Sequence, residues 1–338
     1  MNNNPQIGNI GEFELIKLIE DLVSKKTGKD LLRDDSFFFS LRNEGVDTNL
    51  ILNSDMLVST TDIPPQMNFY QMGRKAVIMN ISDLIVKGVK PRGIIISLGL
   101  PKELKREDFI NIMQGIIDCS MNFNLEYIGG DLNETKEIII NPTAFGFKTP
   151  SAVIFRKGMK PGDILITNNK FGLTGVGFDL LLEKNVDPKG AMNYKRSIMS
   201  ILEPKIPGNE ALILSEHNLA TSSIDSSDGL AKSLRDLMLS NPNYGFEIDF
   251  TEDLVDPEAL IYSQEFNVPL ETLVFNGGEE FNHLFTINPK SLNAAQKVIG
   301  AQGGQIFKIG KVISEDKIYF LKEKEKFELK SHGFEHFK

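Results

Sequence analysis

The amino-acid sequence predicts a two-domain protein of the α+β or α/β class. The chain has 338 residues, more than the roughly 100–200 that are typical of one domain. Segments with the pattern of buried strands alternate with segments of helical periodicity in both halves, an order typical of these classes. Proline, glycine and lysine cluster at 148–163, as is common between domains. We therefore predict an N-terminal domain at 1–148 and a C-terminal domain at 149–338.

Apolar spacing divides the first half into helices and strands. Apolar residues recur at helical spacing in three segments, 12–24, 71–88 and 105–123, which we expect to be helices. Apolar runs rich in β-branched residues predict strands at 49–60, 93–100, 125–131 and 137–147. Prolines follow each of the first two strands, which favours an end of each strand at that point.

The second half begins with an expected strand at 164–168 and a glycine-rich turn at 168–177. Helices are expected to about residue 217, followed by a strand at 219–225 and a further helix. The last expected strands lie at 283–287, 306–312 and 317–322. The apolar runs are too short to cross a bilayer, and the N-terminus lacks the basic and apolar regions of a secretory signal.

Composition and charge narrow the range of functions. Acidic residues outnumber Lys and Arg by 46 to 37, a net charge of -9, which argues against nucleic acid or an anionic membrane as the main partner. Cys119 is the single cysteine, so no intrachain disulfide can form, and its helical context favours buried packing. We expect a cytoplasmic protein, because that compartment is reducing.

Aspartates stand at the ends of apolar strands or in the first turn of the following helix. There are seven: Asp34, Asp35, Asp62, Asp83, Asp131, Asp225 and Asp228. Each alone fits a helix cap or a turn, but α/β folds also assemble their sites at such positions. Carboxylates gathered in one place need cations. Oxygen ligands without His or Cys point to Mg²⁺ bound together with substrate phosphates.

The common nucleotide-binding and hydrolase motifs are missing. The sequence has no G-x-x-x-x-G-K-[ST], no G-x-G-x-x-G with a partner acid and no G-x-S-x-G, so a P-loop, a Rossmann site and a serine hydrolase are disfavoured. The four histidines show no metal-ligand spacing. Glycines at 129–130, 172–177 and 277–278 adjoin candidate segments, although such turns are more often structural. Arg156 fits either a phosphate clamp or a solvated domain edge.

Eight motifs in order resemble the thiamine-monophosphate kinases, within the superfamily that includes aminoimidazole ribonucleotide synthetase. They are RDDSF, STTD, NISDLIVKGVKP, IGGD, FRKGMKPGDILIT, SIDSSDGL, NGGEEFNHLFT and HGFEHF. They are similar, respectively, to the family's G-D-D, S-T-D, N-x-S-D-x-x-x-x-G-x-x-P, G-G-D, R-x-G-x-x-P-G-D, D-x-S-D-G-L, G-G-E-D-Y-E-x-x-F-T and G-[YF]-x-H-F. The resemblance extends over nearly the whole chain.

The resemblance implies ATP-dependent phosphorylation of thiamine monophosphate to thiamine diphosphate, the last step of thiamine diphosphate biosynthesis. It implies a homodimer in which N-terminal mixed sheets pair, with a C-terminal α/β domain closing each active site. The implied Mg²⁺ ligands are Asp35, Thr60, Thr61, Asp62, Asp83, Asp131, Asp225 and Asp228. The implied ATP contacts are Gly130, Asp131, Arg156 and Ser227, and the implied contacts to the thiamine end are Glu279 and Phe334. Asp62, Asp131 and Asp225 would carry metal-assisted chemistry without a general base.

The chemistry of this reaction agrees with the residues. The acceptor is already an anionic phosphate oxygen, so no general base is needed. ATP and a phosphate monoester repel each other, and Mg²⁺ ions held by carboxylates can bring them together.

The sequence also departs from the family pattern. Arg33 replaces the usual glycine before the first aspartate pair, and the segment 64–69 lacks the usual His-Phe, leaving Met67 or Phe69 as the candidate substrate contact. The segment 280–282 differs from the family's D-Y-E.

Two alternatives stay open: a ligase like aminoimidazole ribonucleotide synthetase, and a non-catalytic nucleotide- or thiamine-binding protein. The metal-binding acids argue against the second. Selenophosphate synthetase is disfavoured because the only cysteine lies in the middle of a helix, and a hydrogenase-maturation relative because the chain does not end in cysteine.

Overall fold

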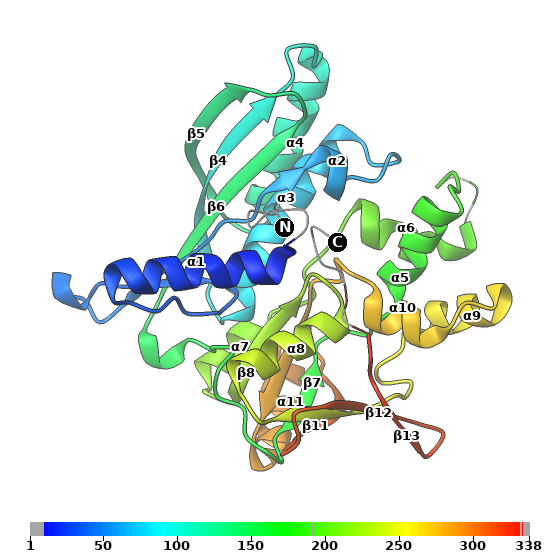
Figure 1. Cartoon of the computed structure of the whole chain (residues 1–338). Helices are drawn as coiled ribbons and strands as arrows, with labels where there is room; N and C mark the ends of the chain where they lie inside the picture. Colours follow the sequence, from blue (N-terminus) through cyan, green and yellow to red (C-terminus); the bar gives the residue numbers. More distant parts are fainter. Residues whose placement is uncertain (1–9, 189, 191, 332, 334–338) are drawn as a thin grey trace, which may run out of the picture.

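The chain forms two β-sheets, one from each half of the sequence, with a buried helix between them (Figure 1). The computed structural model describes residues 10–188, 190, 192–331 and 333. The predicted mixed α/β class is confirmed, because both sheets carry packed helices. In this described part of the chain, none of the helices has both the length and the apolar content that a membrane crossing requires.

The first sheet is mixed. Its strand order is β1-β2-β6-β4-β5, with β3 also paired to β6. Strands β4 and β5 run parallel, and the other pairs are antiparallel. Burial alternates along β6, as expected for a sheet with helices on one face. The strands are β1 (Phe37–Ser40), β2 (Asn49–Asn53), β3 (Leu57–Val58), β4 (Pro91–Leu100), β5 (Glu126–Glu134) and β6 (Ile139–Lys148).

The helices of the first half are α1 (Glu12–Thr27), α2 (Ser59–Asp62), α3 (Phe69–Val86) and α4 (Arg106–Asn122). Helix α3 begins with a capping box between Asn68 and Gln71. Fourteen of its 18 residues are buried, because it contacts β2, β4 and β6 of the first sheet and β8 of the second. It therefore fixes how the two halves sit on each other.

The second sheet has the order β13-β12-β9-β11-β7-β10-β8, and only β9 and β12 pair in parallel among its described strands. The strands are β7 (Ile164–Thr167), β8 (Ala220–Ser226), β9 (Gly245–Asp249), β10 (Asn282–Ile287), β11 (Phe307–Ile313), β12 (Ile318–Lys322) and β13 (Glu325–Glu328). The α-helices are α5 (Leu173–Phe178), α6 (Lys195–Leu202), α7 (Glu210–Glu216), α8 (Leu230–Ser240), α9 (Pro257–Phe266), α10 (Leu270–Asn276) and α11 (Leu292–Gly300).

Buried apolar side chains form one cluster through both halves. Ile94 of β4, Ile81 of α3 and Ile224 of β8 are all almost fully buried, so the two sheets share a continuous core. Cys119 is buried in α4, as the sequence predicts, and burial raises the pKa of its thiol to about 11. The thiolate is therefore rare at neutral pH.

The expected strand at 49–60 is wrong beyond Asn53. Strand β2 ends there, and after the two-residue strand β3 the chain turns into the short helix α2. The chain leaves the strand at Asp55, whose amide donates to Asn80 Oδ1 on α3 at 2.9 Å instead of to a neighbouring strand. At the end of β3 the Val58 amide donates to the Asp62 carboxylate at 2.6 Å as the chain enters α2. The two threonines of α2 therefore lie on a helical turn.

A carboxylate of the same chain occupies the glycine-rich turn at 168–177. Glu280 Oε1 accepts hydrogen bonds from the Gly172 amide at 2.7 Å and the Thr174 amide at 3.4 Å. Free amides at a helix start attract anions, and here Glu280 is that anion. Burial raises the pKa of Glu280 to about 7, although these amides oppose the shift. The turn thus has a structural role.

Gly115→Ala should destabilise the protein. Helices α3 and α4 cross so closely that a Cβ at position 115 would stand 2.0 Å from the Tyr70 carbonyl oxygen. We expect a loss of about 1–3 kcal/mol in the free energy of unfolding, seen as a lower midpoint in thermal unfolding. As a control, Gly300→Ala adds a Cβ with nothing within 4 Å and should leave the midpoint unchanged or slightly higher. Equal midpoints for Gly115→Ala and the native chain would contradict this close crossing.

Glu280→Gln should flatten the dependence of stability on pH. Folded Glu280 keeps its proton up to a pKa of about 7, whereas the unfolded chain releases it near its ordinary pKa of 4.5. The unfolded state therefore binds fewer protons in this interval, and stability falls as pH rises. Glutamine cannot titrate, so the variant should lack up to about 1.4 kcal/mol per pH unit of this slope. Denaturant unfolding between pH 4.5 and 7.5 measures it, and parallel curves would refute the shifted pKa.

Candidate active site

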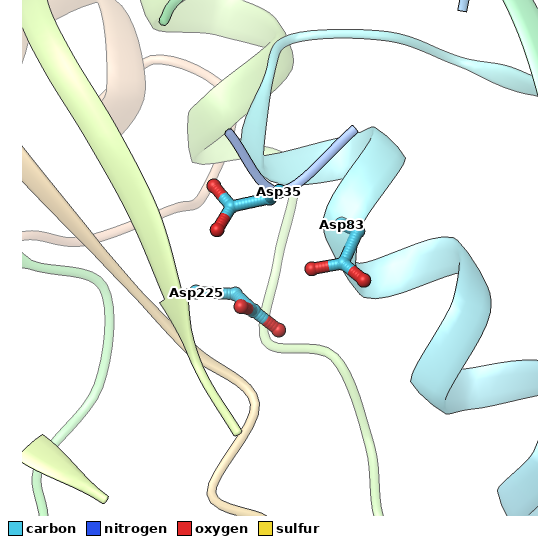
Figure 2. Close-up of side chains that lie close together, drawn as sticks. All are labelled: Asp35, Asp83 and Asp225. Atoms are coloured by element: carbon cyan, nitrogen blue, oxygen red, sulfur yellow. The ribbon is translucent and has the colours of Figure 1, made fainter. Parts of the chain in front are cut away.

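Three aspartates from distant parts of the sequence meet between the two halves (Figure 2). Asp35 precedes β1, Asp83 lies in the last turn of α3, and Asp225 lies near the end of β8. One carboxylate oxygen of each lies within 4.8 Å of the others, and all three residues are buried. We call these residues the aspartate trio.

Hydrogen bonds fix the orientation of two of these carboxylates. Asn53 Nδ2 donates to Asp83 Oδ2 at 2.6 Å, and Ser82 Oγ donates to Asp225 Oδ2 at 2.8 Å. Asn53 is the last residue of β2, and Ser82 precedes Asp83 on α3. The same turn of α3 therefore supplies one member of the trio and positions another.

The trio is electrostatically strained. Burial, followed by repulsion from Asp225, raises the pKa of Asp83 well above its ordinary value. Burial and then Asp35 raise the pKa of Asp225 to about 7. Asp35 behaves differently, because Arg156 and Lys87 outweigh burial and lower its pKa. The site thus combines one firmly ionised carboxylate with two that favour protonation unless another cation is present.

Two cations surround Asp35. Arg156 Nε donates to Asp35 Oδ1 at 2.7 Å, and Arg156 Nη2 contacts the same oxygen. Lys87 Nζ lies 2.5 Å from Asp35 Oδ2 and 2.7 Å from Asp34 Oδ1. Lys87 is fully buried. Arg156 lies after the first sheet in sequence and Lys87 directly after α3, so these ion pairs join separate segments.

The donor set of the trio fits a magnesium ion. It consists only of carboxylate oxygens, which Mg²⁺ prefers. Asp35 Oδ2 is buried and, apart from the Lys87 ammonium 2.5 Å away, has no hydrogen-bond partner among the described residues. Such a carboxylate oxygen keeps electron pairs available for a metal ion.

A second buried lysine joins two further predicted residues. Lys75 Nζ donates to Glu279 Oε1 and to the Asp62 carbonyl oxygen, both at 2.5 Å. Glu279 has a φ of 60°, a left-handed conformation uncommon outside glycine, and its amide donates to the Ser227 carbonyl oxygen. Burial raises the pKa of Glu279, and Lys75 opposes this rise. The strained loop brings Glu279, Asp62 and Ser227 to one side of the interface between the halves.

Other predicted residues lie outside the trio. Asp131 is exposed on β5, and the neighbouring Gly130 packs so tightly that a Cβ would stand 1.7 Å from the Ile96 carbonyl oxygen. On α2, the Thr60 hydroxyl donates to a glutamate carboxylate, and the Thr61 hydroxyl contacts a backbone carbonyl at 3.5 Å. Among the described carboxylates, that of Asp131 does not belong to the group whose oxygens lie within 4.8 Å of one another.

A cavity of about 1160 Å³ lies between α1 and α8. Its polar side includes Asp34, Arg156, Ser227 and Asp228, and its apolar side includes Phe13, Ile16, Ile19, Met238 and Leu239. Asp228 also pairs with Lys232 at 3.3 Å. Since Arg156 both lines this cavity and binds Asp35, the cavity adjoins the trio. Phe334, the remaining predicted contact, lies outside the described residues.

Sequence reasoning missed Lys87, Asn53 and Ser82. A lysine directly after an apolar helix is usually a solvated residue that interacts with the helix C-terminus, so Lys87 gives little signal. Asn53 and Ser82 act through hydrogen bonds to residues far away in sequence. Their spacing carries no local pattern that would reveal such contacts.

Solved structures share this fold. AaThiL complexed with AMPPCP and TMP has a TM-score of 0.81 at 23% identity, covering 99% of this chain and 100% of that one. The crystal structure of tt0281 from Thermus thermophilus has a TM-score of 0.79 at 22% identity, covering 93% of this chain and 98% of that one.

Sequence comparison identifies the family as well as the fold. The family model for the AIR synthase related protein, N-terminal domain, matches residues 33–147. The thiamine-monophosphate kinase of Pyrococcus horikoshii is 30% identical over 328 residues, 97% of this chain and 96% of that protein. The thiamine-monophosphate kinase of Nitrosopumilus maritimus is 31% identical over 330 residues, 97% of this chain and 99% of that protein. Because this identity extends over almost the full length of both proteins, the chain belongs to the thiamine-monophosphate kinase family.

Proposed function

We propose that the protein transfers the γ-phosphoryl group of ATP to the phosphate of thiamine monophosphate, giving ADP and thiamine diphosphate. A phosphate oxygen of the acceptor forms a bond to the γ-phosphorus, and the bond from that phosphorus to the β–γ bridging oxygen breaks. The observation that carries this proposal is the buried aspartate trio in a chain that matches a thiamine-monophosphate kinase over 97% of its length. The acceptor oxygen is already ionised, so the step needs no general base.

The nucleotide fits the cavity between α1 and α8. Its apolar side suits a purine base, and Arg156 and Ser227 on its polar side suit phosphates. A fold neighbour was solved with AMPPCP and TMP, which supports this use of the fold. We assign Gly130 and Asp131 to the ATP site as well, from the motif IGGD.

The carboxylates would hold magnesium. When bound, Mg²⁺ neutralises phosphate charge and brings two anionic substrates together. We propose as ligands the trio and the further residues Thr60, Thr61, Asp62, Asp131 and Asp228. Asn53 and Ser82 keep the Asp83 and Asp225 carboxylates oriented toward the proposed magnesium position. Because these carboxylates are already oriented, they need little reorganisation during the transfer.

The thiamine end would contact Glu279, held by Lys75, together with Phe334 and the segment 64–69. Lys75 and Ser82 are seven residues apart on α3, two turns or about 10 Å along the helix. Lys75 binds Glu279, and Ser82 binds Asp225. This separation suits a substrate with a phosphate at one end and an aromatic ring at the other.

We also propose a homodimer formed by the N-terminal domain at 1–148, with the C-terminal domain at 149–338 closing each active site. Strand β5 is an edge strand, and large apolar side chains are exposed on it and on β4, among them Ile95, Ile128 and Leu132. Helix α3 packs on this sheet and on α4, and these helices leave the exposed apolar residues uncovered. A second copy can therefore cover them. Such a contact would remove both the open edge and the apolar patch from water.

Purified protein incubated with ATP, Mg²⁺ and thiamine monophosphate should form thiamine diphosphate and ADP, and Asp225→Asn should lower kcat by about 100-fold or more. Asparagine keeps the shape of Asp225 but loses the charge that a metal ion needs. Chromatography of the thiamine phosphates measures product, and circular dichroism checks the fold.

Asp253→Asn is the matched control, because Asp253 is exposed in the second half, and it should retain native activity. Native activity in Asp225→Asn would remove that residue from the mechanism. If thiamine monophosphate gave no product but formylglycinamidine ribonucleotide were turned over, the chain would instead be a ligase like aminoimidazole ribonucleotide synthetase.

The dimer predicts twice the chain mass of 37.8 kDa in light scattering. Ile95→Glu combined with Leu132→Glu should shift the protein to the mass of one chain, because the new charges would lie in an apolar contact. Leu260→Glu on α9, also an exposed apolar position, should leave the mass at two chains. A native chain that runs as a monomer would refute the dimer.

A further inference from the structure

Lys87 has the surroundings of a bound cation. Its Nζ lies 2.7 Å from Asp34 Oδ1, 2.5 Å from Asp35 Oδ2 and 2.8 Å from the Ser223 carbonyl oxygen, with Ser223 Oγ at 3.3 Å. An ammonium group has three protons to donate, and these four oxygens offer an acceptor for each of them. The side chains of Lys87, Asp34 and Asp35 have no exposed surface.

The position of Lys87 links three separate segments. The residue follows α3, its carboxylate partners precede β1, and Ser223 lies on β8. A buried lysine is costly unless it is paired and hydrogen-bonded. Lys87 meets both requirements, because Asp34 and Asp35 pair with it and Ser223 accepts its hydrogen bonds. Asp35 also belongs to the trio, so the same contacts connect the lysine to the trio.

The charges of the site do not balance within the protein. Asp34, Asp35, Asp83 and Asp225 bring four negative charges when ionised, and Asp55, which acts on both Asp83 and Asp225, brings a fifth. Lys87 and Arg156 bring two positive charges. Three negative charges are left, more than one divalent ion would neutralise. Without Lys87 four would be left, and the trio would attract metal ions more strongly.

We propose that the Lys87 ammonium is a permanent cation of the active site. It occupies a position among the carboxylates that a metal ion would otherwise fill. It acts as a positioning residue that holds Asp34 and Asp35 in place before any metal binds. This inference rests on the proposed function only in that the trio is the magnesium site.

Lys87→Met tests the proposal in the full-length protein without nucleotide or thiamine monophosphate. Methionine has similar length and no charge. We expect the metal-free variant to unfold several degrees lower than the native chain, because Asp34 and Asp35 lose a counter-ion. We expect Mg²⁺ to bind at least about ten-fold more tightly or with one additional equivalent, measured by titration calorimetry, and to raise the unfolding midpoint more than in the native chain.

Lys184→Met is the control for loss of a lysine pair. Lys184 bonds Asp179 and Tyr262 in the second half, so this variant should lose stability equally with and without Mg²⁺. Asp34→Asn together with Lys87→Met removes one charge of each sign and should return the Mg²⁺ affinity toward the native value. If Lys87→Met alone does not fold, this double variant is compared with Asp34→Asn, and loss of Lys87 should again tighten Mg²⁺ binding.

Unchanged or weaker Mg²⁺ binding after loss of Lys87 would overturn the proposal and leave a lysine with a packing role only. The readout is independent of catalysis. A protein with the expected Mg²⁺ response but no kinase activity would refute the proposed function alone, and an active kinase without that response would refute only the role of Lys87.

Discussion

The structure depends on holding several carboxylates out of water at one place between two sheets. Buried carboxylates repel one another and favour protonation unless cations lie among them. Lys87 and Arg156 both bind Asp35, from separate segments of the chain. The contacts that balance charge are therefore also contacts that hold the halves together. Separating the halves would leave buried charges unpaired, which is far more costly than losing a surface ion pair.

Helix α3 makes this arrangement possible. It presents Lys75 and Ser82 toward the second half and carries Asp83 itself. A helix holds side chains at fixed spacing, so residues from one rigid element set the distance between Glu279 and Asp225. Close packing against α4 at Gly115 holds the other side of α3. A shift of this helix would therefore move all of these contacts together.

The sequence predicted much of the fold and named the three aspartates that meet in the trio. Periodicity revealed α3 and α4 because their apolar faces are long. The expected positions of the aspartates hold for Asp225 near the end of β8, but Asp35 precedes β1 and Asp83 lies in the last turn of α3. The expected strand at 49–60 was wrong beyond Asn53 because the Asp55 amide donates to the Asn80 side chain of α3 instead of to a neighbouring strand. No local pattern separates this case from a continuous strand.

The contacts that could not be predicted are those between distant residues. The glycine turn at 168–177 had the composition of an anion site, and only tertiary structure showed that Glu280 fills it. Lys87 has the local sequence of a solvated lysine, yet it is fully buried among oxygens. The composition shows that acidic residues exceed basic residues over the whole chain, but the charge balance that matters for the site is local. It is decided by which cation the fold brings to which carboxylate.

Arg156 shows how this local charge balance connects to the cavity between α1 and α8. Asp35 uses the donors at Nε and Nη2 of the guanidinium, and a guanidinium has five donors in all. Arg156 also lines the cavity between α1 and α8, so its remaining donors can meet a phosphate while Asp35 stays bound. A lysine has all three of its donors on one nitrogen atom, whereas the planar fork of a guanidinium directs donors to partners on different sides. The side chain that holds Asp35 is thus also part of the wall of this cavity.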